Sequence, residues 1–208
     1  MFSREGRVLF THVSRTAGVA ITESLRRALP DLRGVSGQHD PLIAARPILG
    51  QEFGEIFKFA IVRNPWDRFV SWYALIGQTL CGDSVDPASL ADPSSDHWKG
   101  FDEFLEQWAS ETIEVEGVTF RTLSQWAQLS DLDGVLLTDD LGRFESIDAD
   151  CERLFGEIGL NWRAPARINT SSHEHYSVYY STFGRELVEH VFQDDIAGFG
   201  YQFSALSM

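Results

Sequence analysis

The sequence contains few cysteines and no long apolar run. Its 208 residues include only Cys81 and Cys151, which lack the paired spacing of a zinc or redox motif and are interpreted as packing residues in a reducing compartment. No stretch of 18 apolar residues predicts a membrane span, and no apolar segment at the N-terminus predicts an export signal. We therefore expect a cytoplasmic protein that has no membrane partner.

Positive charge is also scarce. The chain has 17 Lys and Arg residues against 31 Asp and Glu residues, a formal net charge of −14. Such a charge opposes binding to nucleic acid and to polyanions, because repulsion acts at every encounter. The imbalance is uneven, since residues 1–72 hold ten basic and seven acidic residues, whereas the remainder holds seven and 24. An anionic ligand is therefore expected in the first third of the chain.

A strand that runs directly into a helix is the most informative pattern. Residues 57–62 are apolar, aromatic and β-branched, which predicts a buried strand, and Asn64 and Pro65 suit the N-cap and first turn of a helix. A helix N-terminus attracts anions, and Arg63 adds a guanidinium shaped for phosphate. The alternative interpretation is a surface arginine before an ordinary helix.

A second element of this kind lies upstream. Residues 7–13 predict a strand, residues 14–18 a tight polar loop and residues 19–29 a helix, so Arg15 also stands at a helix entrance. The loop does not match the pattern GxxxxGK[ST], because no glycine opens it and no Gly-Lys-Ser/Thr closes it. An ordinary ATP or GTP loop, and with it a nucleotide kinase, is disfavoured.

The order of the remaining elements predicts the fold class. We expect helices over residues 41–50, 101–108, 147–158 and 185–194 and near Tyr176, and a short strand over residues 134–138. Strands separated by helices indicate an α/β fold, with a central, mainly parallel sheet, helices on both faces and ligands at the carboxyl ends of the strands. We expect residues 1–208 to form a single domain.

Five segments, in order along the chain, resemble the sulfotransferase family, in particular the branch with carbohydrate O-sulfotransferases and small bacterial relatives. Phe10–Gly18 is similar to its loop F-x-H-x-P-K-T-A-G, and Val62–Ser71 is similar to V-R-[ND]-P-x-x-R-x-x-S. The later segments are Gly142–Ile147 (G-R-F-E-x-L), Asn169–His173 (N-x-S-x-H) and Asp195–Tyr201 (D-I-x-x-F-G-Y). The resemblance implies a P-loop-like sulfotransferase fold and transfer of a sulfuryl group from 3′-phosphoadenosine 5′-phosphosulfate, without a metal.

The resemblance also implies which residues hold this donor. The 5′-phosphosulfate is expected on the polar loop and the first helical turn, at Arg15, Thr16, Ala17, Gly18 and Val19. The 3′-phosphate is expected on Arg63, Ser71, Thr170 and Ser171. Thr170 and Ser171 could equally cap the helix that follows them. Arg15 stands at the family's loop lysine, and this position implies a catalytic role for it.

The loop departs from the family pattern at several positions. Arg15 keeps the positive charge of the lysine but presents a larger planar group, and Ser14 replaces a proline. Val19 and Ala20 stand where the family usually has hydroxyl residues. These departures keep a second hypothesis open, in which the chain is a non-catalytic nucleotide-binding or scaffold protein on the same fold.

His39 is the best candidate for the catalytic base among the six histidines. Residues 37–40 form a polar, loop-like segment between the two donor elements, and the family often carries a histidine in a comparable place. The alternatives are a merely solvated His39 and a nearby carboxylate, Asp40. His12 is interpreted as a hydrogen-bonded core imidazole, and His173 and His175 lack a third metal ligand.

The acceptor is expected to be a small molecule or a carbohydrate that offers a hydroxyl or an amine. The net charge of −14 disfavours a heavily sulfated polysaccharide, so a small alcohol, phenol or amine-bearing compound fits better. Neither nucleic acid nor a membrane is expected as a partner. The oligomeric state and the identity of the acceptor stay open.

Overall fold

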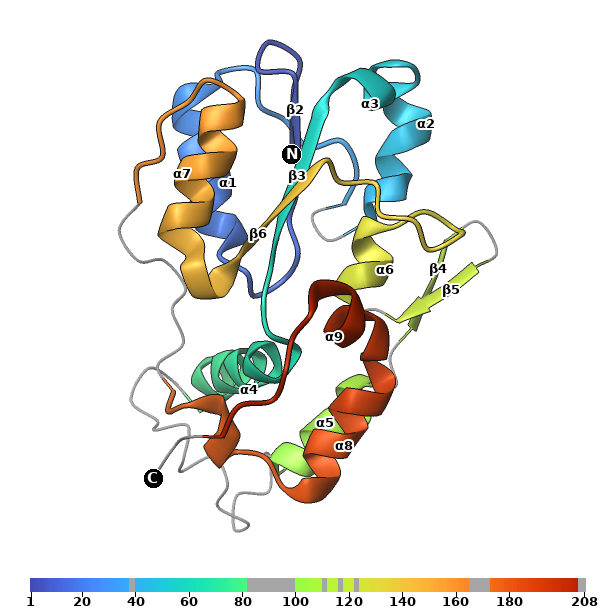
Figure 1. The fold of residues 1–208 in the computed structure, drawn as a ribbon, viewed down its shortest axis with the longest axis vertical. Helices are drawn as coiled ribbons and strands as arrows, with labels where there is room; N and C mark the ends of the chain where they lie inside the picture. The colour runs from blue at the N-terminus through green and yellow to red at the C-terminus, as the bar shows by residue number, and fades with distance from the viewer. Residues whose placement is uncertain are drawn as a thin grey trace. The chain divides into compact units, whose positions relative to one another are not determined.

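In the computed structural model the chain folds into two compact units. Figure 1 shows the fold, with a colour that runs from blue at the N-terminus to red at the C-terminus. It describes residues 1–37, 40–81, 100–109, 112–115, 118–121, 124–164 and 173–205. The first unit comprises Met1–Arg63, Glu114–Phe120 and Gln125–Asn169. The second comprises Asn64–Ile113, Arg121–Ser124 and Thr170–Met208. The single domain expected over residues 1–208 stays a prediction.

A four-stranded sheet forms the centre of the first unit. Its strands, in spatial order, are β1 (Phe2–Ser3), β2 (Val8–Thr11), β3 (Phe57–Val62) and β6 (Asp140–Arg143). The short edge strand β1 is antiparallel to β2, whereas β2, β3 and β6 are parallel, with Phe10 opposite Phe59 and Ile61 opposite Gly142. The predicted mainly parallel sheet is confirmed, and the carboxyl ends of β2 and β3 lie next to each other.

Helices cover both faces of this sheet (Figure 1). On one face lie α1 (Gly18–Ala28) and α7 (Ile147–Glu157), which begins after the short helix η3 (Phe144–Ser146). On the other lie η1 (Leu42–Ala45), α2 (Arg46–Leu49), α3 (Glu52–Glu55) and α6 (Gln125–Leu129). Alternate residues of β2 enter the two cores, Val8 and Phe10 on the α1 side and Leu9 on the other. The α/β class with helices on both faces is confirmed.

The strand predicted over residues 134–138 is wrong. Val135 is 61% exposed, and Leu136 makes only an isolated bridge with Ser130. The third parallel strand is β6 instead, where Gly142 lets the strand pack closely. A Cβ atom on Gly142 would lie 2.5 Å from Ile61 Cδ1 and 2.9 Å from Leu154 Cδ1. Tertiary packing therefore selects a polar, glycine-containing segment over the more apolar one before it.

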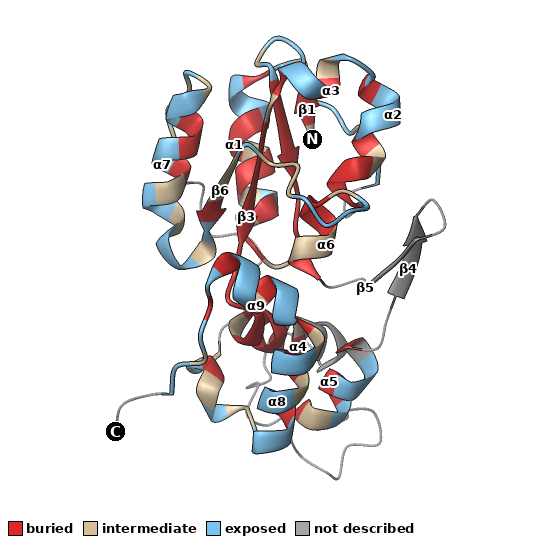
Figure 2. Ribbon diagram, turned by 45° about the vertical axis from the view of Figure 1, so that its right-hand side comes forward, coloured by how far each residue is buried: buried red, intermediate tan, exposed pale blue. Residues whose placement is uncertain are grey.

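The second unit is helical. It contains α4 (Pro65–Cys81), α5 (Phe101–Ala109), η4 (Tyr176–Val178), α8 (Thr182–Val191) and α9 (Gln193–Phe199). Aromatic rings hold these helices together: the centroid of Tyr73 lies 5.1 Å from that of Phe101, and the centroid of Phe69 lies 5.1 Å from that of Phe192. Figure 2 shows how the buried faces of α5 and α8 meet. The predicted helices that begin at Pro65 and at Phe101 are confirmed.

A separate two-stranded sheet pairs β4 (Thr112–Val115) with β5 (Val118–Arg121). None of the helices in the described part of the chain is both long enough and apolar enough to span a bilayer.

Candidate functional site

The loop between β2 and α1 has the backbone of an anion-binding nest. Arg15 and Ala17 have φ angles of 64° and 62°, in the left-handed region, and Thr16 between them does not. This alternation turns successive backbone N–H groups toward one side, and α1 adds the free N–H groups of its first turn. A left-handed conformation costs a non-glycine residue about 1–2 kcal/mol. Backbone strain of this kind is often found at binding sites, where the surrounding structure maintains it.

Gly18 allows this loop to close onto β2. A Cβ atom at Gly18 would overlap the imidazole ring of His12, which is 9% exposed and stacks on Phe10 with 6.2 Å between ring centroids. Thr16 is fully buried, and its hydroxyl donates to the Val13 carbonyl over 2.8 Å. Because that bond uses the hydroxyl proton, Thr16 can donate to a ligand through its backbone N–H. The predicted core position of His12 is found.

Arg63 follows the end of β3 and reaches the same loop. Its Nη1 donates to the Arg15 carbonyl over 3.1 Å, and its Cζ lies 4.0 Å from the centroid of the Phe144 ring. Gln125 holds its backbone from both sides, because Arg63 N–H donates to Oε1 over 2.9 Å and Nε2 donates to the Arg63 carbonyl over 2.8 Å. Arg15 and Arg63, far apart in sequence, are therefore brought together.

Two cations close together favour a bound anion. Burial, and then the positive charge of Arg63, lowers the pKa of Arg15 from its ordinary value to about 10. Arg15 therefore stays charged at neutral pH, at an electrostatic cost to the folded chain. An anion beside the two guanidiniums would lower that cost, so the arrangement of the loop and Arg63 suits an anionic ligand.

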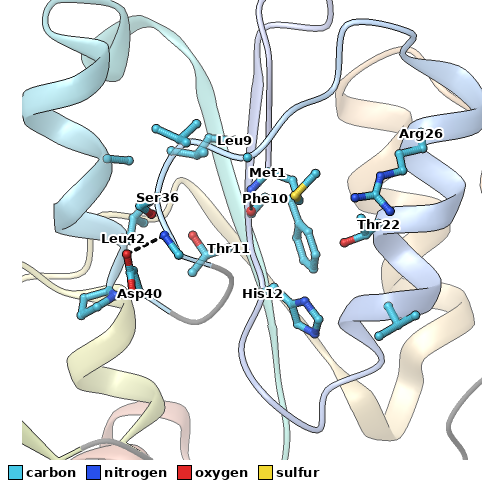
Figure 3. A pocket seen from close by; sticks show the side chains of 16 residues that line it. Met1, Leu9, Phe10, Thr11, His12, Thr22, Arg26, Ser36, Asp40 and Leu42 are labelled. Carbon is cyan, nitrogen blue, oxygen red and sulfur yellow. Dashed lines mark hydrogen bonds between the residues drawn. The ribbon is translucent and has the colours of Figure 1, made fainter. Parts of the chain in front are cut away.

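A cavity of about 350 Å³ lies beside the loop (Figure 3). Its lining comes from Met1, the carboxyl end of β2, one face of α1, and residues of the ranges 34–37 and 40–45. Gly37 and Asp40 are part of the lining, and the Gly37 N–H donates to Asp40 Oδ2 over 2.6 Å. The expected base, His39, lies outside the described residues, between these two in sequence.

The second unit holds the other residues expected to bind donor. Asn64 caps α4 as predicted, since its Oδ1 accepts from the backbone N–H of Trp66 over 3.0 Å and of Asp67 over 3.4 Å. Ser71 is fully buried on the same helix. Thr170 and Ser171 lie outside the described residues.

A buried ion pair joins two of the motif segments within the second unit. Arg68 Nη1 and Asp195 Oδ2 are 4.0 Å apart, both side chains are almost fully buried, and the Ser124 hydroxyl donates to Asp195 Oδ1 over 2.9 Å. Arg68 belongs to the segment 62–71 and Asp195 to the segment 195–201. These motif residues therefore have a structural role.

Replacing Asp195 with alanine is expected to lower the free energy of unfolding by about 3–5 kcal/mol, because it removes the carboxylate that faces the buried Arg68 cation. Urea denaturation followed by circular dichroism measures the loss. The matched control is Asp194→Ala, which removes the exposed carboxylate next to Asp195 in the first turn of α9 and should change stability by less than about 1 kcal/mol. Equal losses in the two variants would contradict the role of the buried pair.

Sequence reasoning missed two residues of the site. Gln125 holds the Arg63 backbone from 62 positions away, and no local pattern identifies such a glutamine. Phe144 carries the Arg63 guanidinium on its ring. Its position in the segment Gly142–Ile147 marks it as part of a motif, although not with this role.

Comparison with known protein families identifies one relationship. A family model described as "Sulfotransferase family" matches residues 44–202, well over half of the chain. The matched range includes Arg63, Ser71, Gln125 and Asp195 and begins after the loop that carries Arg15. Neither the curated proteins nor the solved structures contain a significant match to this chain.

Proposed function

This chain belongs to the sulfotransferase family, and we propose on that basis that it transfers a sulfuryl group from 3′-phosphoadenosine 5′-phosphosulfate to a hydroxyl or amine of a small acceptor. The observation that supports this most is the nest formed by the backbone of residues 14–18, together with the guanidinium groups of Arg15 and Arg63. Backbone N–H groups, a helix N-terminus and two guanidiniums suit a nucleotide that carries a phosphosulfate and a further phosphate.

In the proposed reaction the acceptor oxygen attacks sulfur, and the bond between sulfur and the 5′-phosphate oxygen breaks. Negative charge then grows on that leaving oxygen. The N–H groups of Thr16, Ala17 and Gly18 hold the phosphosulfate, Val19 forms the adjoining wall, and Arg15 stabilises the leaving oxygen. His39 takes the proton of the acceptor. Arg15 and the backbone N–H groups supply the charge stabilisation, so the proposed mechanism uses no metal.

The 3′-phosphate is assigned to Arg63 and Ser71, with Thr170 and Ser171 as further donors. The bond from Arg63 to the Arg15 carbonyl and its contact with the Phe144 ring fix the plane of the guanidinium before any ligand arrives. A preorganised cation binds with a smaller entropy cost than a mobile surface arginine. For this reason Arg63 should contribute strongly to donor affinity.

Replacing Arg63 with alanine should weaken binding of 3′-phosphoadenosine 5′-phosphate by about 1.5–3 kcal/mol, the range for a lost charge-assisted hydrogen bond. Ser71→Ala should cost less, because a neutral donor is lost. Calorimetric titration measures both, and Arg63→Lys is the control that keeps the charge. Wild-type protein that binds adenosine 5′-phosphate as tightly as its 3′-phosphorylated form would rule out the donor assignment.

A non-catalytic nucleotide-binding protein is the second candidate. Two observations favour it: Val19, at the position of a family hydroxyl, is 37% exposed, and the Thr16 hydroxyl already bonds within the loop. Fewer side-chain hydroxyls are then available to the phosphosulfate. Slow hydrolysis of the donor by the wild-type chain separates the two functions, because only an enzyme releases the sulfuryl group.

The cytoplasm is the proposed location. Cys151 is a free, buried thiol, and burial raises its pKa to about 12, so it stays protonated and unreactive. A thiol of this kind suits a reducing compartment.

A further inference from the structure

One face of α1 lines the cavity beside the proposed donor loop. Val19, Thr22 and Arg26 recur at helical spacing, so their side chains share that face, and all three are part of the cavity wall. The face starts one residue after Gly18, where the loop enters the helix. Arg26 lies two turns after Val19, about 11 Å along the helix axis at 1.5 Å per residue.

Thr22 and Arg26 are the polar side chains of this face, and that of Thr22 is buried whereas that of Arg26 is exposed. The Thr22 hydroxyl has no hydrogen-bond partner among the residues that the structure describes, and a buried hydroxyl left unbonded is unfavourable. Arg26 likewise forms no ion pair with the residues that the structure describes, whereas its neighbour Arg27 pairs with Glu23. Figure 3 shows Thr22 and Arg26 side by side on the cavity side of the helix.

The rest of the cavity limits what can bind there. Its remaining wall combines apolar side chains, among them Leu9, Phe10 and Leu42, with polar ones, among them Thr11, His12 and Ser36. The one carboxylate among its lining residues, Asp40, lies across the cavity from Arg26 in Figure 3. A volume of about 350 Å³ is near the lower end for ligand pockets. The lining therefore suits a small ligand with an apolar body and a single anionic group.

We propose that this cavity binds the acceptor, and that the acceptor is a small alcohol or phenol that carries a carboxylate, held by Arg26 and Thr22, at the end opposite its reacting hydroxyl. This inference rests on the proposed function, because the reacting hydroxyl must face the donor at the N-terminus of α1. The guanidinium fork matches a carboxylate in shape and charge, and the Thr22 hydroxyl gains an acceptor. A polyanion is disfavoured, since its further charges would meet the carboxylate of Asp40.

Three phenols that differ only at the far end test the inference: 3-(4-hydroxyphenyl)propanoate, its amide, and tyramine. Calorimetry measures the binding of each to the full chain saturated with 3′-phosphoadenosine 5′-phosphate. We expect the carboxylate to bind about tenfold more tightly than the amide, with tyramine weakest. In Arg26→Ala the preference for the carboxylate should disappear.

Arg27→Ala is the matched control, because it removes the same charge from the same last turn of α1 but from a residue that does not line this cavity. It should keep the wild-type preference. Three results would each overturn the acceptor assignment: wild type binds the carboxylate and the amide equally, wild type does not bind the carboxylate, or Arg26→Ala keeps the preference for the carboxylate. If wild type instead bound adenosine 5′-phosphate as tightly as 3′-phosphoadenosine 5′-phosphate, the proposed function would be overturned. The two failures are therefore distinguishable.

Discussion

Replacing His39 with alanine is expected to lower turnover by about 10²- to 10⁴-fold and to leave the affinity for 3′-phosphoadenosine 5′-phosphate nearly unchanged. Histidine is the side chain whose ordinary pKa suits a base at neutral pH. Its sequence neighbours Gly37 and Asp40 line the cavity proposed for the acceptor. Steady-state transfer to a phenol gives the turnover, and calorimetry gives the nucleotide affinity.

Asp40→Asn is the control for this experiment. It removes a carboxylate that lines the same cavity but keeps a side-chain oxygen able to accept from the Gly37 N–H. If His39 is the base, Asp40→Asn should retain most of the turnover, and the acidic limb of the rate profile should be lost in His39→Ala alone. Wild-type turnover in His39→Ala, together with a large loss in Asp40→Asn, would assign the base role to Asp40.

The two strand-to-helix elements could be predicted because their features are local. Asn64 and Pro65 define the start of α4 whatever the rest of the chain does, and the cap bonds of Asn64 are found in the structure. Apolar runs before each loop similarly indicated β2 and β3. Parallel pairing of these strands then places Arg15 and Arg63 at one edge of the sheet.

The remaining features depend on contacts between distant residues. No sequence pattern distinguishes β6 from the more apolar segment before it, because the choice depends on the space that Gly142 leaves for Ile61 and Leu154. The left-handed backbone of Arg15 and Ala17 also contradicts their local preferences. Such backbone strain persists only when the surrounding structure imposes it. It therefore cannot be predicted from the local sequence of the loop.

Replacing Arg15 with alanine is expected to lower turnover by about 10²-fold or more, while binding of 3′-phosphoadenosine 5′-phosphate falls far less. In the proposed reaction the negative charge beside Arg15 is larger in the transition state than in the bound donor, so loss of Arg15 should affect the rate more than the affinity. Donor hydrolysis, or transfer to a panel of phenols and amino alcohols, measures the rate without knowledge of the natural acceptor.

The ligand-free chain should tolerate this substitution. Burial and the charge of Arg63 hold the pKa of Arg15 below its ordinary value, so at any pH below about 10 the charged side chain destabilises the folded state. Arg15 is partly exposed to solvent, and screening keeps this cost small. Thermal unfolding of Arg15→Ala should therefore occur at the wild-type temperature or slightly above it. A large drop would assign Arg15 a structural role instead.

Arg15→Lys separates an enzyme from a chain that has lost catalysis. Lysine restores the family residue and keeps the charge but presents a compact ammonium instead of a planar fork, so an active wild type should lose only part of its rate in this variant. Wild type that binds the nucleotide tightly but neither hydrolyses nor transfers the sulfuryl group would support the non-catalytic alternative. If Arg15→Lys then gained activity, arginine at this position would itself be the cause of inactivity, because the loop, Arg63 and the cavity are otherwise unchanged between the two proteins.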